Sequence, residues 1–188
     1  MKNNYYERNK LTRLKRGKEV ERIFTNILNE KWNYSITAAT KYQDIYEHFD
    51  IKFTSKKDNK TIYYIDIKGR NWLDGKYQDK YIWLELVNNY GFAGWVFTCS
   101  ADTSNFAFEF EDHFLVIESL KVRDWINNYV DMNKVLRTDS WHLKHHIQDI
   151  YKAGTYNRYS KTPNDRLCLI HYNDLLELGA IRIDKLQE

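Results

Sequence analysis

The segment "YYIDIKGR", residues 63–70, carries two groups of opposite charge, Asp66 and Lys68, at the end of an apolar, β-branched run. Residues two apart on a β-strand point to the same face, so a strand here places the carboxylate and the ammonium side by side. Two interpretations follow. The pair is either an ordinary solvated ion pair on an edge strand, or a catalytic pair that the strand carries to the edge of a sheet.

A second carboxylate stands in the preceding apolar segment, "HFDIKF". Its alternation predicts a strand over residues 49–53 in which Asp50 points away from the apolar face. The connection to the next strand is short, so we expect the two strands to be antiparallel neighbours with Asp50 beside Asp66. Two adjacent carboxylates repel each other unless a cation lies between them. Asp44 and Asp58 stand nearby in the sequence and are alternatives to Asp50.

Residues 17–28 have the spacing of an amphipathic helix, because apolar side chains recur at i, i+3, i+4, i+7 and i+8. These side chains are Val20, Ile23, Phe24, Ile27 and Leu28. Glu21 lies about 20° beyond one edge of this stripe and Glu19 about 40° beyond the other. Gly17 lies inside the stripe, where the missing side chain is expected to let the helix approach a neighbour closely. Glu21, the nearer to the core, is therefore expected to reach a site at the strand ends.

Glu21, Asp50 and Asp66 would together offer carboxylate oxygens, which hard divalent ions such as Mg²⁺ and Mn²⁺ prefer as ligands. A cation held there lowers the pKa of a bound water and neutralises charge on a phosphate. Lys68 would add a positive charge near the attacking water or the scissile phosphate. The residue types thus predict a metal centre for phosphodiester chemistry. Its catalytic groups would be the three metal ligands, Glu21, Asp50 and Asp66, together with Lys68.

These residues resemble the PD-(D/E)XK nuclease superfamily, whose pattern is a helix carrying Glu, a strand opening with Asp, and a strand bearing (Asp/Glu)-x-Lys. The "RGKEVER" helix is similar to the opening helix of archaeal Holliday-junction resolvases, and residues 83–110 resemble small nuclease-like proteins of bacteria and their phages. The resemblance covers residues 15–130. It implies that Glu21, Asp50 and Asp66 hold the metal and that Lys68 assists catalysis.

The resemblance implies an α+β fold with a restriction-endonuclease-like core, that is, a mixed β-sheet flanked by helices. We expect one domain, residues 1–188, with its core at 15–130 and an extension of unassigned role at 131–188. Phe49 stands where the family has a proline, and residues 69–80 are too polar and glycine-broken for the helix that usually follows the (Asp/Glu)-x-Lys strand. Periodicity predicts further strands at 81–87, 94–99, 106–110, 114–119 and 166–170, and helices at 120–130 and 172–179.

Basic residues crowd the N-terminus, where eight of the first 22 residues are Lys or Arg. Such an arm suits the phosphate backbone of a nucleic acid, although a solvated terminus fits as well. Residues 156–166 mix basic and aromatic side chains, as in strand-binding surfaces. The predicted nucleic-acid contacts are Arg13, Lys15, Arg16, Lys18, Arg70, Arg158, Lys161 and Arg166. Glu85, in "IWLELV", either extends the metal site, lines the DNA cleft, or is an outward-facing charge on an alternating strand.

These observations predict a metal-dependent DNA nuclease that uses Mg²⁺ or Mn²⁺. Two alternatives stay open: a catalytically silent nucleic-acid-binding module of the same fold, and a phage-type protein that binds a host protein through its aromatic surface. The resemblance also allows a homodimer, since such nucleases often pair to cut both strands. No apolar run approaches the roughly 18 residues that span a bilayer. We expect a cytoplasmic protein of a bacterial cell or a phage-infected host, without a membrane partner.

Overall fold

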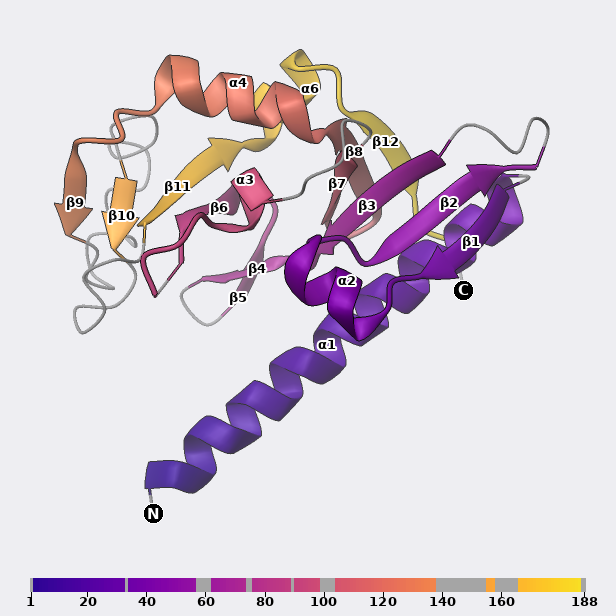
Figure 1. The fold of residues 1–188 in the computed structure, drawn as a ribbon, viewed down its shortest axis with the longest axis horizontal. Coiled ribbons are helices and arrows are strands. Elements are labelled where there is room, and N and C mark those ends of the chain that lie inside the picture. The colour runs from indigo at the N-terminus through magenta and orange to yellow at the C-terminus, as the bar shows by residue number, and fades with distance from the viewer. Residues whose placement is uncertain are drawn as a thin grey trace.

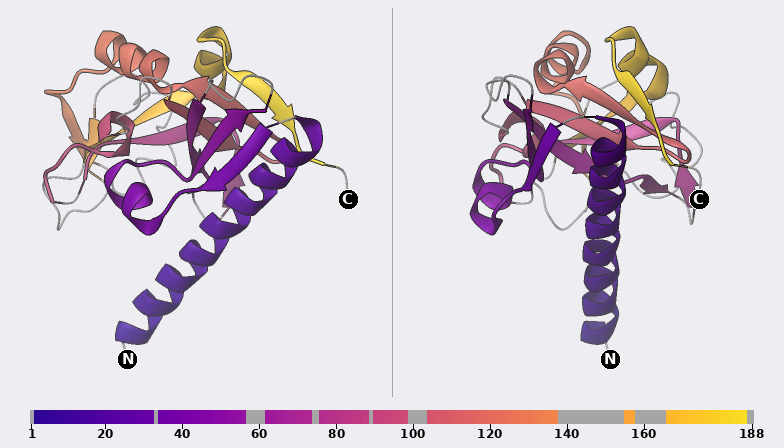
Figure 2. Two further views of the ribbon diagram at one scale, coloured as in Figure 1. Left: turned by 45° about the vertical axis from the view of Figure 1, so that its right-hand side comes forward. Right: turned by 90° about the vertical axis from the view of Figure 1, so that its right-hand side faces the viewer.

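Helix α1 (Lys2–Lys31) packs its C-terminal half against a sheet, while its N-terminal half extends beyond the rest of the fold (Figures 1 and 2). The structure is a computed structural model that describes residues 2–32, 34–56, 62–73, 76–88, 90–98, 104–137, 155–157 and 166–186. The helix is longer than the predicted residues 17–28, because the preceding segment is rich in Lys, Arg and Leu, which favour helices.

Six strands form a mixed sheet in the order β1-β2-β3-β7-β8-β12. They are β1 (Tyr34–Ala38), β2 (Ile51–Ser55), β3 (Ile62–Lys68), β7 (Ser104–Glu109), β8 (His113–Glu118) and β12 (Ile181–Asp184). Strands β3 and β7 are parallel, and the other neighbouring pairs are antiparallel. β3 has a neighbour on each side over Ile62–Ile65, so it is not an edge strand, but β2 ends there and the segment with Asp66 and Lys68 is paired with β7 alone.

A second sheet has the order β6-β11-β10-β9, and two more strands form the hairpin β4-β5. Their bounds are β6 (Tyr81–Val87), β11 (Arg166–His171), β10 (Thr155–Asn157), β9 (Val135–Arg137), β4 (Asn71–Leu73) and β5 (Lys76–Gln78). Other helices are α2 (Lys41–Tyr46), α3 (Trp95–Thr98), α4 (Ser119–Tyr129) and α6 (Tyr172–Glu177). The hairpin lies in the link at 69–80, so the expectation of no helix there is confirmed for its described residues.

The close approach expected at Gly17 is wrong. A Cβ atom added at Gly17 would meet no atom within 4 Å, so among the described residues nothing packs against that position of α1. The close contact lies at Gly69, immediately after β3, where an added Cβ would lie 3.4 Å from Cγ2 of the buried Val20. The end of β3 therefore crosses α1 at Val20.

The sequence predicts a strand at residues 94–99, but the described part of this segment forms the one-turn helix α3. The cause is a close backbone approach at Gly94, where an added Cβ would lie 2.1 Å from the carbonyl oxygen of Glu85 in β6. The bulky side chains that suggest a strand instead pack into the core, since Val96 is fully buried and Trp95 packs against it from the rim. Tertiary packing thus overrides β-propensity here.

The six-stranded sheet has a hydrophobic core on each face. Toward α1, the buried sheet residues are Ile51, Phe53, Ile65, Ile67, Ala107, Phe114 and Ile183. Away from α1, the core includes side chains of β7, β6 and α4, among them Phe106, Phe108, Leu84, Val122 and Ile126. Alternation along β3 directs its isoleucines toward α1 and directs Asp66 and Lys68 toward the other face, as the sequence predicts.

The two glycines test this arrangement. Gly94→Ala should lower the free energy of unfolding by about 2 kcal/mol or more, because a methyl group cannot lie 2.1 Å from a backbone oxygen unless β6 or α3 moves. Gly17→Ala should raise that free energy by up to ~1 kcal/mol, because alanine favours helix and its Cβ would meet nothing. Urea denaturation measures both, and equal stabilities of the two variants would contradict the packing of α3 against β6.

Candidate functional site

Asp66 and Lys68 form a closed ion pair at the C-terminal end of β3. Nζ of Lys68 lies 2.7 Å from Oδ1 of Asp66, whose side chain is 4% exposed, whereas that of Lys68 is 31% exposed. The second oxygen, Oδ2 of Asp66, is buried and has no hydrogen-bond partner among the described residues. A buried carboxylate oxygen without a donor is costly. The interpretation as an ordinary solvated ion pair is therefore wrong.

Trp95 is a neighbour of this pair that sequence reasoning missed. Nζ of Lys68 lies 4.6 Å from the centroid of the Trp95 ring, a cation–π contact. The ring is held by edge-on packing against Phe106, with 5.1 Å between centroids. Trp95 begins α3, so a strand at 94–99 would not predict this contact. The ammonium is thus held between a carboxylate and an aromatic face.

Asp50 lies beside Asp66, as predicted, because Ile51 pairs with Ile65 in the β2–β3 ladder. Oδ2 of Asp50 accepts a hydrogen bond from the N–H of Ile67 at 2.6 Å, and the N–H of Asp50 donates to the carbonyl of Ile65 at 2.9 Å. The side chain thereby continues the ladder past the start of β2. Burial, followed by repulsion from Asp66, raises the pKa of Asp50 to about 8, although Lys68 and the Ile67 N–H favour the charged form.

The strand alternation expected over residues 49–53 fails at its first position. The Phe49 ring packs on Tyr64, with 4.8 Å between centroids, instead of joining Phe53 toward α1. His48, immediately before it, has a left-handed backbone with φ of 52°, so the chain turns before β2 begins. Phe49 thus anchors the turn that positions Asp50.

Of the two helix candidates, Glu21 is the one that interacts electrostatically with Asp66 and Lys68. Burial first, and then the charge of Asp44, raise the pKa of Glu21, and Lys68 and Asp66 also act on it. Glu19 instead pairs with Arg22 at 2.7 Å on the exposed side of α1. The alternatives to Asp50 do not replace it, since Asp44 is exposed on α2 and Asp58 lies outside the described residues.

Glu85 also acts on Lys68. Burial alone would lower the pKa of Lys68, but Asp66, Asp50 and Glu85 outweigh it and raise that pKa. In β6, Leu84 and Leu86 face the core and Glu85 alternates with them, half-buried. Its carboxylate therefore points out of the β6 core and lies within electrostatic range of the candidate site.

These carboxylates influence one another electrostatically, but they do not form a ligand cage as they stand. Over the described ranges, no group of three or more His, Cys, Asp and Glu side chains is arranged to hold a metal ion. What the structure brings together is Asp50 and Asp66 beside the ammonium of Lys68, whereas Glu21, half-buried on α1, acts on Asp50 only through its charge.

Two of the predicted nucleic-acid contacts already hold carboxylates. Nη2 of Arg16 lies 2.6 and 2.7 Å from the two oxygens of Glu109, whose side chain is fully buried and also accepts from Lys185 at 2.9 Å and from the Arg70 N–H at 3.1 Å. The Arg70 guanidinium makes two hydrogen bonds to Asp79, at 2.9 and 2.8 Å. Sequence reasoning missed Glu109, and its place inside the apolar segment "FAFEF" was the available signal.

The other basic predictions are placed unevenly. Lys15 and Lys18 are exposed on α1, and within the described residues neither forms an ion pair. Arg166 is half-buried at the start of β11. The side chain of Arg13 and all of Arg158 and Lys161 lie outside the described residues.

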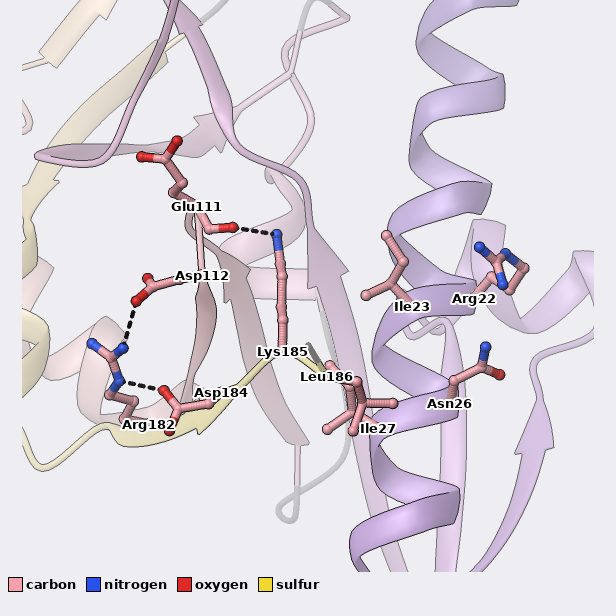
Figure 3. Close-up of a pocket in the computed structure, with 10 residues that line it drawn as sticks. All are labelled: Arg22, Ile23, Asn26, Ile27, Glu111, Asp112, Arg182, Asp184, Lys185 and Leu186. Atoms are coloured by element: carbon pink, nitrogen blue, oxygen red, sulfur yellow. Dashed lines mark hydrogen bonds and ion pairs between the residues drawn. The ribbon is translucent and has the colours of Figure 1, made fainter. Parts of the chain in front are cut away.

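A separate cavity of about 720 Å³ lies between α1 and the β8–β12 side of the sheet (Figure 3). Ile23 and Ile27 of α1 face it from one side, and Arg182 and Lys185 from the other. Its charges are largely paired, because Arg182 bonds to Asp112 and to an aspartate of β12. None of the four predicted catalytic residues lines it.

In comparisons with family models, with curated proteins and with solved structures, the chain has no match. Among the described helices, none combines the length and apolar character needed to cross a membrane.

Asp50→Asn tests the charge arrangement without a ligand. Because the folded pKa of Asp50, about 8, lies above its ordinary 3.8, its contribution to stability is full below about pH 3.8 and is lost as the pH rises toward 8. The amide oxygen of asparagine still accepts from Ile67 and carries no charge. The melting temperature of Asp50→Asn in EDTA should therefore fall less than that of wild type between pH 5 and pH 9. Asp124→Asn, on the exposed side of α4, is the control, and equal slopes for Asp50→Asn and wild type would contradict the assignment.

Glu109→Gln tests the Glu109 hub on the α1 face, the cluster in which Arg16, Lys185 and the Arg70 N–H all donate to the Glu109 carboxylate. The change leaves Arg16 and Lys185 without their buried partner, so it should lower the free energy of unfolding by about 3 kcal/mol. Glu19→Gln, which breaks only the exposed pair with Arg22, should leave that free energy nearly unchanged. Both are measured by urea denaturation, and a Glu109→Gln protein as stable as the Glu19→Gln protein would rule out a hub.

Proposed function

We propose that this protein is a metal-dependent nuclease that hydrolyses phosphodiester bonds of DNA at the C-terminal end of β3. The observation that carries the proposal is the buried Oδ2 of Asp66, which has no donor among the described residues and lies beside Asp50, whose pKa is raised by burial and then by the charge of Asp66. A structural carboxylate would have its oxygens satisfied. An unsatisfied one beside Asp50 is a place where a cation would relieve repulsion.

The donor chemistry fits Mg²⁺ or Mn²⁺. Hard divalent ions take carboxylate and water oxygens, and Glu21, Asp50 and Asp66 would supply the former. Cation binding displaces a proton from a carboxyl group whose pKa is raised, so the proton on Asp50 below about pH 8 is compatible with this role. When bound, the ion supplies charge neutralisation at the phosphate and lowers the pKa of a water.

Lys68 would stabilise the charge that develops on the phosphate. Its raised pKa keeps the amine protonated at neutral pH, because the charges of Asp66 and Asp50 outweigh the effect of burial. The Trp95 ring and Oδ1 of Asp66 hold the ammonium in place, and its 31% exposure leaves it accessible to a substrate. A charge fixed in advance where the transition state needs it is worth more than a mobile one.

The arrangement of the chain supports a restriction-endonuclease-like core. The elements follow the order that the resemblance implies: helix α1 carries Glu21, Asp50 immediately precedes β2, and β3 carries Asp66 and Lys68. The sheet is mixed and has helices on both faces (Figure 1). The hairpin β4-β5 after β3 departs from the family's usual helix. Exposed Lys15 and Lys18 on α1 suit a polyanion.

A catalytically silent nucleic-acid-binding module is the second candidate. The closed pair between Lys68 and Asp66, together with the lack of a ready ligand cage among the described residues, favours it. It predicts that Asp66→Ala leaves nucleic-acid affinity intact or improves it, because the change removes a negative charge near the bound phosphates.

Cleavage of plasmid, linear and branched DNA with Mg²⁺ or Mn²⁺ tests the proposal. Asp66→Ala and Lys68→Ala should each slow cleavage by about 100-fold or more, as loss of a charge-stabilising group does. Glu21→Ala should also slow it, whereas Glu19→Ala, two residues away on the exposed side, should not. If wild type and variants behave alike on every substrate, the site is wrong. If wild type binds DNA and never cleaves it, the silent module stands instead.

A further inference from the structure

Helix α2 has an exposed aromatic face for which the proposed reaction gives no role. None of its residues is buried, and Tyr42, Ile45 and Tyr46 are 64%, 47% and 66% exposed. The two tyrosine rings pack together, with 4.7 Å between centroids, so they present one combined surface. Large apolar side chains gathered on one turn of a surface helix indicate a binding surface.

The charges of α2 are segregated around its axis. At about 100° per residue, Lys41, Ile45, Tyr42 and Tyr46 share an arc of about 140°. Asp44, also exposed, lies outside this arc, about 60° beyond its Lys41 edge, and after burial its charge is the next cause that raises the pKa of Glu21. The outward arc therefore combines aromatic rings with one ammonium and no carboxylate. This combination suits a polyanion that carries flat rings.

The face is held rigidly next to the candidate site. The Thr40 side chain accepts from the Gln43 N–H at 3.3 Å and the Gln43 side chain accepts from the Thr40 N–H at 3.0 Å, so the helix start is capped. Beyond its end, the Phe49 ring is anchored on Tyr64, immediately before Asp50. Figures 1 and 2 show α2 at the surface beside the start of β2, away from α4. Tyr46 is four residues from Asp50 in the chain.

We propose that the outward face of α2, formed by Lys41, Tyr42, Ile45 and Tyr46, is a stacking platform for unpaired bases of the nucleic-acid strand that enters the candidate site. The choice of nucleic acid as occupant rests on the proposed function. In a duplex the faces of the bases are covered by their neighbours, whereas unpaired bases can stack on aromatic side chains. The platform thus selects a single strand or a substrate with an unpaired segment.

Binding of wild type in EDTA to a single strand of about 12 nucleotides that contains 2-aminopurine tests the platform. Stacking should quench the fluorescence of the analogue. Tyr42→Ala/Tyr46→Ala should weaken binding by about tenfold or more and abolish the quenching, because stacking on each ring is worth about 1–3 kcal/mol. Tyr42→Phe/Tyr46→Phe keeps the rings and should retain both. Tyr129→Ala, at a tyrosine 55% exposed on α4, is the matched control and should bind as wild type does.

The outcomes separate this inference from the proposed function. Unchanged affinity and quenching in the double alanine variant overturn the platform, and so does an equal loss of affinity for a fully paired duplex. Loss of a dimer in light scattering on that variant would assign the face to a second copy. If wild type cleaves DNA and Tyr42→Ala/Tyr46→Ala binds the single strand as wild type does, the platform alone is overturned. Tyrosine-dependent binding without any cleavage overturns the nuclease alone, and neither cleavage nor binding overturns both.

Discussion

A buried carboxylate on an interior strand is the constraint on which this structure depends. Asp66 is placed where β2 stops short of the end of β3, so the backbone of Ile67 has no strand partner on that side. The Asp50 side chain supplies the missing acceptor and, in doing so, comes beside Asp66. Burial and then the charge of Asp66 raise the pKa of Asp50. The unfavourable electrostatic energy is concentrated at this point, and among the described residues the ammonium of Lys68 offsets it.

The same sheet contains a buried carboxylate that is treated in the opposite way. Glu109, on the neighbouring strand β7, points toward α1 and receives hydrogen bonds on both oxygens from Arg16, Lys185 and the Arg70 N–H. Asp66, on the other face, has Lys68 on one oxygen and, among the described residues, nothing on the other. Full satisfaction indicates a structural role for Glu109. The missing donor to Oδ2 distinguishes Asp66, as part of a candidate site, from a structural ion pair at comparable burial.

Local periodicity was sufficient for the strands and helices that position the site. Alternation in "TIYYIDIK" predicted both β3 and the shared face of Asp66 and Lys68, and a short connection predicted that Asp50 lies beside them. Local periodicity failed where a long-range contact decides the local structure. At α3, Gly94 lets the backbone lie close to β6, and the sequence of residues 94–99 does not reveal that β6 is its neighbour. The Glu109 hub joins residues 93 and 76 positions apart in sequence, so only the folded chain reveals it.

Helix α1 links the two carboxylate environments mechanically. Arg16, which binds Glu109, and Glu21, on which the charge of Asp66 acts, are five residues apart, and Val20 between them lies against Gly69. A rotation of α1 by one residue, about 100°, would separate Arg16 from Glu109 and turn Glu21 away from the strand ends. The contact between Arg16 and Glu109 therefore fixes the rotation of α1 and, with it, the direction in which Glu21 points. The N-terminal half of α1 extends beyond the sheet, and the contact between Arg16 and Glu109 lies where the half that packs on the sheet begins.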